Sequence, residues 1–138
     1  SQYTQAEAKK YFIERIRCKK PIKTGVIWWN LLDGWPQVSD AVVDYYFSKK
    51  EAYDYIKRSQ QEVVIMLDEL NSNSCDIIAV NDTLKEVKGS YKIYNIDTDY
   101  VYSEGGFSIS KNCAEIRCNA SWIVSNVFAF VKYSIGPK

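Results

Sequence analysis

The chain contains 138 residues, enough for one ordinary domain or for one small domain and a piece of another. Its 18 basic and 17 acidic residues give a net charge of +1, so no basic surface is indicated for nucleic acid or for an anionic membrane. The absence of histidine excludes Ser-His-Asp and Cys-His catalysis and every metal site that requires a histidine.

A helix and then an apolar strand are predicted at the start of the chain. Between Gln5 and Cys18 the apolar residues recur at helical spacing, and Thr4 with Glu7 three residues later fits a capping box. Pro21 ends this helix. The apolar run from Thr24 to Leu31 then predicts a parallel strand that is covered on both faces.

A second helix is predicted from Lys49 to Gln60, with Ser48 as its N-cap. A long loop separates this helix from the apolar strand. Helix, strand, loop and helix in this order are typical of a slice of an α/β barrel.

The end of the apolar strand is rich in tryptophan. Trp28, Trp29 and Trp35 fall within eight residues and are accompanied by Asn30 and Asp33. Indole rings stack on the apolar face of a pyranose, and amide or carboxylate groups hydrogen-bond its hydroxyls, so the pattern favours a sugar-binding strand end. The alternative, for any single tryptophan, is a core strand with bulky side chains.

After Gln61 the helical period disappears, and short strand-like segments separated by polar turns predict an immunoglobulin-like β-sandwich. Turn residues occur at 71–74, at Asn81-Asp82 and at Glu104-Gly105-Gly106, where we expect a solvated hairpin turn. The expected strands are Glu62 to Leu67, Cys75 to Val80, Gly89 to Ile96, Tyr100 to Ile109, Ala114 to Asn119 and Ile123 to Tyr133.

The four cysteines show neither zinc-ribbon spacing nor a redox Cys-x-x-Cys, which favours dispersed reduced thiols, and we expect no metal or cofactor. Cys113 and Cys118 would pair only in an oxidising compartment, and on one extended segment they would face opposite sides of a sheet. With no basic-then-apolar leader visible, this usage favours a cytoplasmic location over a secreted one. No apolar stretch is long enough to span a bilayer, so no membrane partner is expected.

Residues 5 to 60 resemble glycoside hydrolase family 2, in particular its β-mannosidase-like and β-galactosidase-like members. Those enzymes carry a pattern close to I-W-x-L-N-D-x-W-P, followed by Val-Asp-Tyr-Tyr and then Lys-Pro-Ala-Tyr-Tyr-x-x-Lys-Arg. The chain departs from it at Leu32, where the family usually has Asn, and at Glu51, where it often has Pro. The matching positions are Trp29, Leu31, Asp33, Trp35, Pro36, Val43, Asp44, Tyr45, Tyr46, Lys50, Ala52, Tyr53, Lys57 and Arg58.

The resemblance implies a mainly β chain, in which the last helix-strand-helix piece of a (β/α)₈ barrel precedes an immunoglobulin-like sandwich. Residues 1–60 would be the slice of barrel, and residues 61–138 would be the sandwich. The parent enzyme would hydrolyse β-glycosides with retention and without a cofactor. The family's catalytic Glu pair follows the fourth strand and ends the seventh, so both residues would lie upstream and the isolated chain would be inactive.

The resemblance also assigns site residues. Trp29 matches the family tryptophan that forms a platform under the sugar and is often joined to its successor by a cis peptide. Asp33 either touches a sugar hydroxyl or holds the loop through backbone N–H groups, and Trp35 either lines the pocket rim or packs within the loop. Trp28, by alternation, faces the helices as a core residue, and Asp44 has a structural role.

Two further hypotheses remain open: a free-standing carbohydrate-binding module and a purely structural or interaction domain. A buried parallel strand such as the predicted apolar strand requires a neighbouring strand on each side. We therefore expect it either to pack on the sandwich or to cause self-association of the chain.

Overall fold

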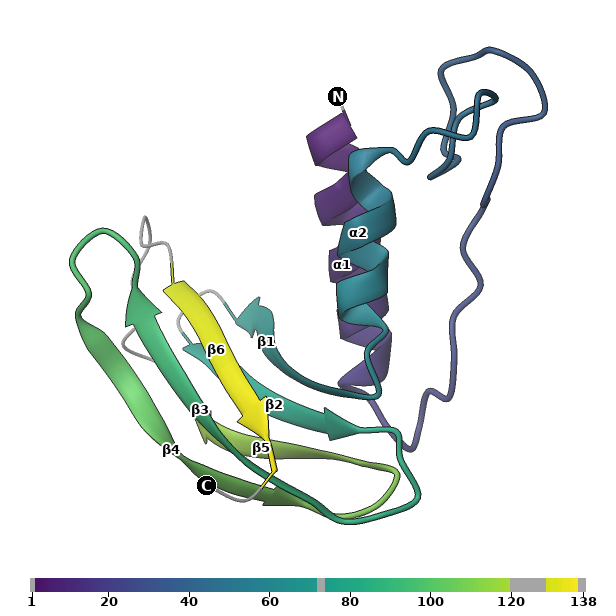
Figure 1. Ribbon diagram of the computed structural model, residues 1–138. Coiled ribbons are helices and arrows are strands. Elements are labelled where there is room, and N and C mark those ends of the chain that lie inside the picture. The colour runs from purple at the N-terminus through teal and green to yellow at the C-terminus, as the bar shows by residue number, and fades with distance from the viewer. Residues whose placement is uncertain (1, 72–73, 120–128, 137–138) are drawn as a thin grey trace. The chain divides into compact units, whose positions relative to one another are not determined.

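The computed structural model describes residues 2–71, 74–119 and 129–136, and it divides the chain into two compact units, Ser1–Gln61 and Glu62–Lys138 (Figure 1). The division lies one residue from the boundary expected from the sequence. The described residues are mainly β, with two antiparallel three-stranded sheets and two helices, and those of the second unit are consistent with a β-sandwich.

The first unit is built on two helices that lie side by side, α1 (Gln2–Arg17) and α2 (Glu51–Ser59) (Figure 1). Arg17, at the end of α1, donates from its guanidinium to the backbone oxygens of Ser59 and Gln61, which fixes the two helix ends together. The helices and the loop before α2 enclose a small apolar core, and alanines let the backbones approach closely. This core contains Ala6, Ile13, Val42, Ala52 and Ile56.

Both helix starts differ from the sequence expectation. Because α1 already begins at Gln2, Thr4 lies inside the helix, so the predicted capping box is wrong. Lys50 is the N-cap of α2 and makes no side-chain cap bond, so the predicted cap by Ser48 is also wrong. The backbone of Ser48 is engaged instead in a turn, where its N–H donates to Asp44 Oδ1 and its carbonyl accepts from Asp44 N.

The apolar run from Thr24 to Leu31 does not form a strand, contrary to expectation. A β-strand needs a neighbour to accept and donate its ladder bonds, and the described residues supply only isolated bridges from Val43 to Leu32 and Lys49. The run still alternates in burial. Val26 and Trp28 pack against the helix core, as predicted for Trp28, whereas Ile27 is 96% exposed.

The second unit contains the six strands that the sequence predicts, with shifted ends. One sheet has the order β1-β2-β5, from β1 (Val63–Asn71), β2 (Ser74–Asn81) and β5 (Cys113–Asn119). The other has the order β4-β3-β6, from β3 (Val87–Asn95), β4 (Val101–Ile109) and β6 (Ala129–Ile135). Residues 123–128 of the last expected strand lie outside the described part. The core is formed by Val63, Ile65, Ile77, Ala79, Ile93, Phe107 and Ile109.

The turn between β2 and β3 is organised by Asn81, whose side chain is fully buried. Its amide N–H₂ donates to the carbonyls of Lys85, Ile109 and Ser110, and its oxygen accepts from Thr83 N and Oγ1. A buried amide is stable when its donors and acceptor are all satisfied. The predicted turn at Asn81-Asp82 is therefore confirmed, and Asn81 also ties this turn to the end of β4.

The predicted hairpin turn at Glu104-Gly105-Gly106 is wrong. These residues lie in the middle of β4, where Gly105 pairs with Tyr91 of β3. A Cβ on Gly105 would lie 3.7 Å from the Tyr91 ring, so the aromatic side chain fills the space that glycine leaves. Two adjacent glycines are a local turn signal, whereas the packing of Tyr91 over Gly105 depends on strand pairing, which the local sequence does not show.

Replacement of Gly89 by Ala should destabilise the second unit. A Cβ there would lie 2.2 Å from the Ser134 carbonyl oxygen and 2.6 Å from Phe107 Cζ, so backbone and core must both shift. We expect the free energy of unfolding to fall by about 1–3 kcal/mol in urea denaturation followed by circular dichroism. Gly105→Ala, whose new methyl meets nothing closer than 3.7 Å, is the matched control, and equal losses in both variants would contradict the assignment.

Candidate functional site

Two tryptophans of the first unit are largely exposed, Trp29 by 77% and Trp35 by 64%. The Trp29–Asn30 peptide is cis, as the resemblance implies. Lys9 of α1 donates from Nζ to the Trp29 carbonyl oxygen at 2.7 Å, and the same ammonium lies 5.2 Å from the centroid of the Trp28 ring. Burial lowers the pKa of Lys9. The Trp29 backbone is thus held on α1 while its ring faces solvent.

Asp33 lies in the loop after Trp29 and is buried, with 2% of its surface exposed. Its carboxylate accepts hydrogen bonds from Lys50 Nζ at 2.8 Å, from Ser39 Oγ, and from Gln37 Nε2 at 3.3 Å. The bonds from Lys50 and then Ser39 hold the pKa of Asp33 below its ordinary value, although burial opposes them. The carboxylate is therefore turned into the protein, where it joins the loop to the start of α2.

Backbone hydrogen bonds hold the returning part of this loop against the end of the apolar run. Val42 N donates to the Asn30 carbonyl at 3.3 Å, and Val43 N donates to the Leu31 carbonyl at 2.9 Å. Asp33 N in turn donates to the Val43 carbonyl at 3.1 Å. Trp29 is therefore followed directly by a segment that is hydrogen-bonded to residues 42 and 43.

A tight turn presents more aromatic side chains beyond Val43. Asp44 Oδ1 accepts from Tyr46 N at 2.9 Å and from Ser48 N at 2.8 Å, which confirms the structural role expected for this acid. Phe47 adopts a left-handed φ of 64° and is 77% exposed, and Tyr46 is 72% exposed. This conformation is unfavourable for a bulky residue. The two hydrogen bonds to Asp44 Oδ1 offset that energetic cost and stabilise the turn.

The exposed indoles of Trp29 and Trp35 can stack on an apolar ring face. Among the described residues, no group of three or more His, Cys, Asp or Glu side chains could hold a metal ion. Cys18 and Cys113 form no disulfide within the described part of the chain, and the side chains of Cys75 and Cys118 lie outside that part. Across the residues that are described, no helix is long and apolar enough to cross a membrane.

Sequence reasoning missed three residues that support the site: Lys9, Ser39 and Lys50. Lys50 matches the family pattern, which was the one available signal for it. Lys9 donates to the backbone oxygen of Trp29, and Ser39 donates to the carboxylate of Asp33. No sequence pattern indicates either contact.

Solved structures of similar fold include two glycosidases. The chain matches the β-D-mannosidase from Dictyoglomus thermophilum with a TM-score of 0.84 and 27% identity, over 96% of this chain and 17% of that one. It also matches the Amycolatopsis orientalis exo-chitosanase CsxA, with a TM-score of 0.69 and 19% identity, over 98% of this chain and 17% of that one. These structural neighbours are both glycoside hydrolases.

The likeness to CsxA shows the fold alone, while the mannosidase adds sequence similarity to the same fold. The chain spans about one sixth of the length of either enzyme. No protein-family model and no curated protein matches the chain.

Asp33 should give the first unit an acid-sensitive stability. Its pKa is depressed in the folded state below the ordinary 3.8, so the ionised carboxylate stabilises the fold above that value, and this contribution is lost as pH falls through the folded pKa. We expect Asp33→Asn to lower the melting temperature at pH 7 and to flatten its decline between about pH 5 and pH 2.

Asp40→Asn is the control, because it removes the same charge from an exposed neighbour in the same loop. Thermal unfolding across this pH range measures both variants. If Asp33→Asn and Asp40→Asn followed the same profile as the unsubstituted chain, the carboxylate would not be stabilised by Lys50.

Proposed function

We propose that the chain is the carboxyl-terminal portion of a retaining β-glycoside hydrolase of family 2. In this proposal the first unit completes a (β/α)₈ barrel and the second is an immunoglobulin-like accessory sandwich. The observation that carries the proposal is the exposure of Trp29, whose indole lies open at the end of an apolar run. The fold shared with the mannosidase supports it independently.

The alternating burial of the run supports a place in a barrel. Val26 and Trp28 contact the helix core, whereas Ile27, Trp29 and Leu31 are exposed by 96%, 77% and 60%. In a (β/α)₈ barrel one face of each strand packs on the helices and the other faces the barrel interior. Residues 27, 29 and 31 would fill that interior, where the other strands would cover them.

Catalysis in such an enzyme uses two carboxyl groups about 5–5.5 Å apart, one as acid/base and the other as nucleophile. Both would belong to the part of the parent enzyme that precedes this segment. Trp29 would supply the platform under the sugar ring, and Trp35 would extend the apolar surface. Asp33 would act by fixing the loop that carries Trp35, through Lys50 and Ser39, rather than by reaching the sugar.

A second candidate is a carbohydrate-binding module without catalysis. It is favoured by the exposure of both Trp29 and Trp35, which could bind a sugar without further strands. The two candidates differ in the coding sequence upstream of Ser1. The hydrolase requires a continuous frame with further barrel strands and two Glu residues at strand ends, whereas the module requires none of these.

Trp29→Ala should impair the polypeptide encoded by that longer frame. With p-nitrophenyl β-D-mannoside as substrate, we expect kcat/KM to fall at least about tenfold, or ~1.4 kcal/mol of transition-state stabilisation, because the ring contact is lost. Trp29→Phe keeps an aromatic ring and should retain most of the activity. Full activity of Trp29→Ala would contradict the platform role, and inactivity of the longer polypeptide on every β-glycoside would contradict the hydrolase.

The isolated chain should self-associate through residues 24–31. Ile27 is 96% exposed, and the run has no strand neighbour among the described residues. We expect sedimentation velocity to show concentration-dependent association, which Ile27→Lys should abolish because a charge opposes the burial of this face. Val38→Lys is the control, since Val38 is fully exposed outside the run. A monomer at high concentration would exclude this association.

A further inference from the structure

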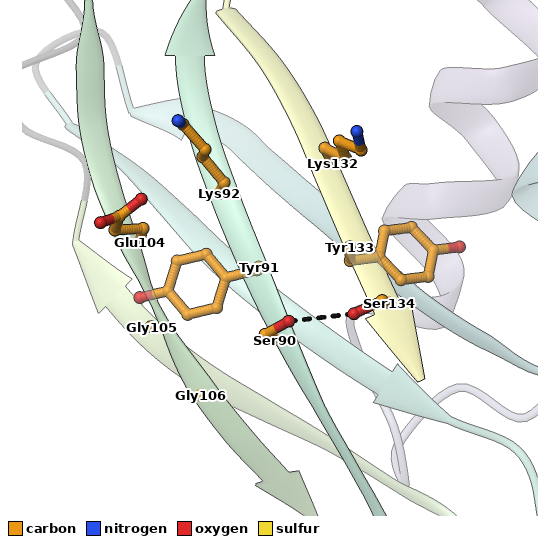
Figure 2. Close-up of a pocket in the computed structure, with 9 residues that line it drawn as sticks. All are labelled: Ser90, Tyr91, Lys92, Glu104, Gly105, Gly106, Lys132, Tyr133 and Ser134. Atoms are coloured by element: carbon orange, nitrogen blue, oxygen red, sulfur yellow. Dashed lines mark hydrogen bonds between the residues drawn. The ribbon is translucent and has the colours of Figure 1, made fainter. Parts of the chain in front are cut away.

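The outer face of the β4-β3-β6 sheet carries a shallow depression of about 410 Å³ that the glycosidase proposal does not use. Alternation along β3 places the side chains of Ser90 and Lys92 on this face, whereas those of Tyr91 and Ile93 lie on the core side of the sheet. The lining residues that share the outer face are Ser90, Lys92, Glu104, Gly106, Lys132 and Ser134 (Figure 2).

Small residues open one end of this depression. Ser90 pairs in register with Gly106 on one side and with Ser134 on the other. Gly106 places no side chain over the sheet, and a Cβ there would meet only the Gly89 carbonyl oxygen, at 3.7 Å. The two serine hydroxyls lie 2.9 Å apart and form a hydrogen bond (Figure 2). This end therefore offers space and two hydroxyl groups.

The other end carries charge. Lys92 stands directly opposite Lys132 on β6 and opposite Glu104 on β4, and all three are exposed (Figure 2). Like charges directly opposite on neighbouring strands destabilise a sheet. Within the described part of the chain, none of the three forms an ion pair. An anionic group between the two ammonium groups would relieve their repulsion and accept charge-assisted hydrogen bonds.

We propose that this depression binds an acidic sugar unit. The carboxylate of the sugar lies between Lys92 and Lys132, and its hydroxyls reach Glu104 and the Ser90–Ser134 pair. The volume falls within the range of about 300–1,000 Å³ that is usual for small-ligand sites. The two ammonium groups favour a carboxylate over a neutral sugar, and Glu104 can accept a hydrogen bond from a sugar hydroxyl, which an anion such as sulfate does not offer. The site is independent of Trp29 and of the function proposed for it.

The test is a titration of the 138-residue chain with the methyl glycoside of galacturonic acid, followed by ¹H–¹⁵N correlation spectra. We expect saturable shifts at the amides of the lining residues, and an affinity that falls as salt rises. The methyl glycoside of galactose, which differs only in the carboxylate, should bind at least about tenfold more weakly.

Lys132→Ala should weaken binding of the acidic glycoside at least about fivefold, because one of the two ammonium groups is lost. Lys88→Ala is the matched control, since Lys88 lies on the same sheet outside the depression and pairs with Glu86 at 3.4 Å. The spectrum of each variant reports its folding directly.

Three results would overturn the proposal. The first is the absence of saturable shifts with the acidic glycoside. The second is binding of inorganic sulfate with equal affinity and the same shifts, which would make this a simple anion site. The third is an equal loss of affinity in Lys88→Ala, which would attribute the effect to net charge alone.

Discussion

The ion pair between Lys50 and Asp33 fixes the long loop of the first unit to the start of α2. The Asp33 carboxylate has no exposed surface and the Lys50 side chain is 12% exposed, so neither charge is well solvated. A buried charge is tolerated only with a partner and further hydrogen bonds, which Ser39 and Gln37 supply. Because Lys50 is also the N-cap of α2, the pair joins the Trp-bearing loop to the helix pair.

Trp28 and Trp29 are neighbours in the sequence but have different environments in the first unit. Trp28 packs on the helix core, and Lys9 lies over its ring, so it contributes to folding within the unit. Trp29 is fixed through its backbone oxygen while its ring remains open. The backbone that carries this ring is therefore ordered before any ligand stacks on it, which lowers the entropic cost of binding.

The sequence predicted the elements that depend on local pattern, namely two helices, six strands and the turn at Asn81. It failed where a distant residue decides the local state. Gly105 and Gly106 are typical turn residues, but here they lie within β4, where the ring of Tyr91 on the neighbouring strand covers Gly105. Thr24 to Leu31 read as a strand, but a strand requires partners that the described residues do not supply.

The candidate site shows the same division. The family resemblance implies that Trp29 presents its ring to a sugar, and alternation places Trp28 on the opposite side. The inward direction of Asp33 follows from neither, because it depends on Lys50, 17 residues further along the chain. The exposed apolar face at residues 27, 29 and 31 belongs to a run whose other face, at Val26 and Trp28, packs against the core of the first unit. The buried ion pair and the capped turn lie in the loop that follows this run, so they stabilise the chain next to the exposed face without covering it.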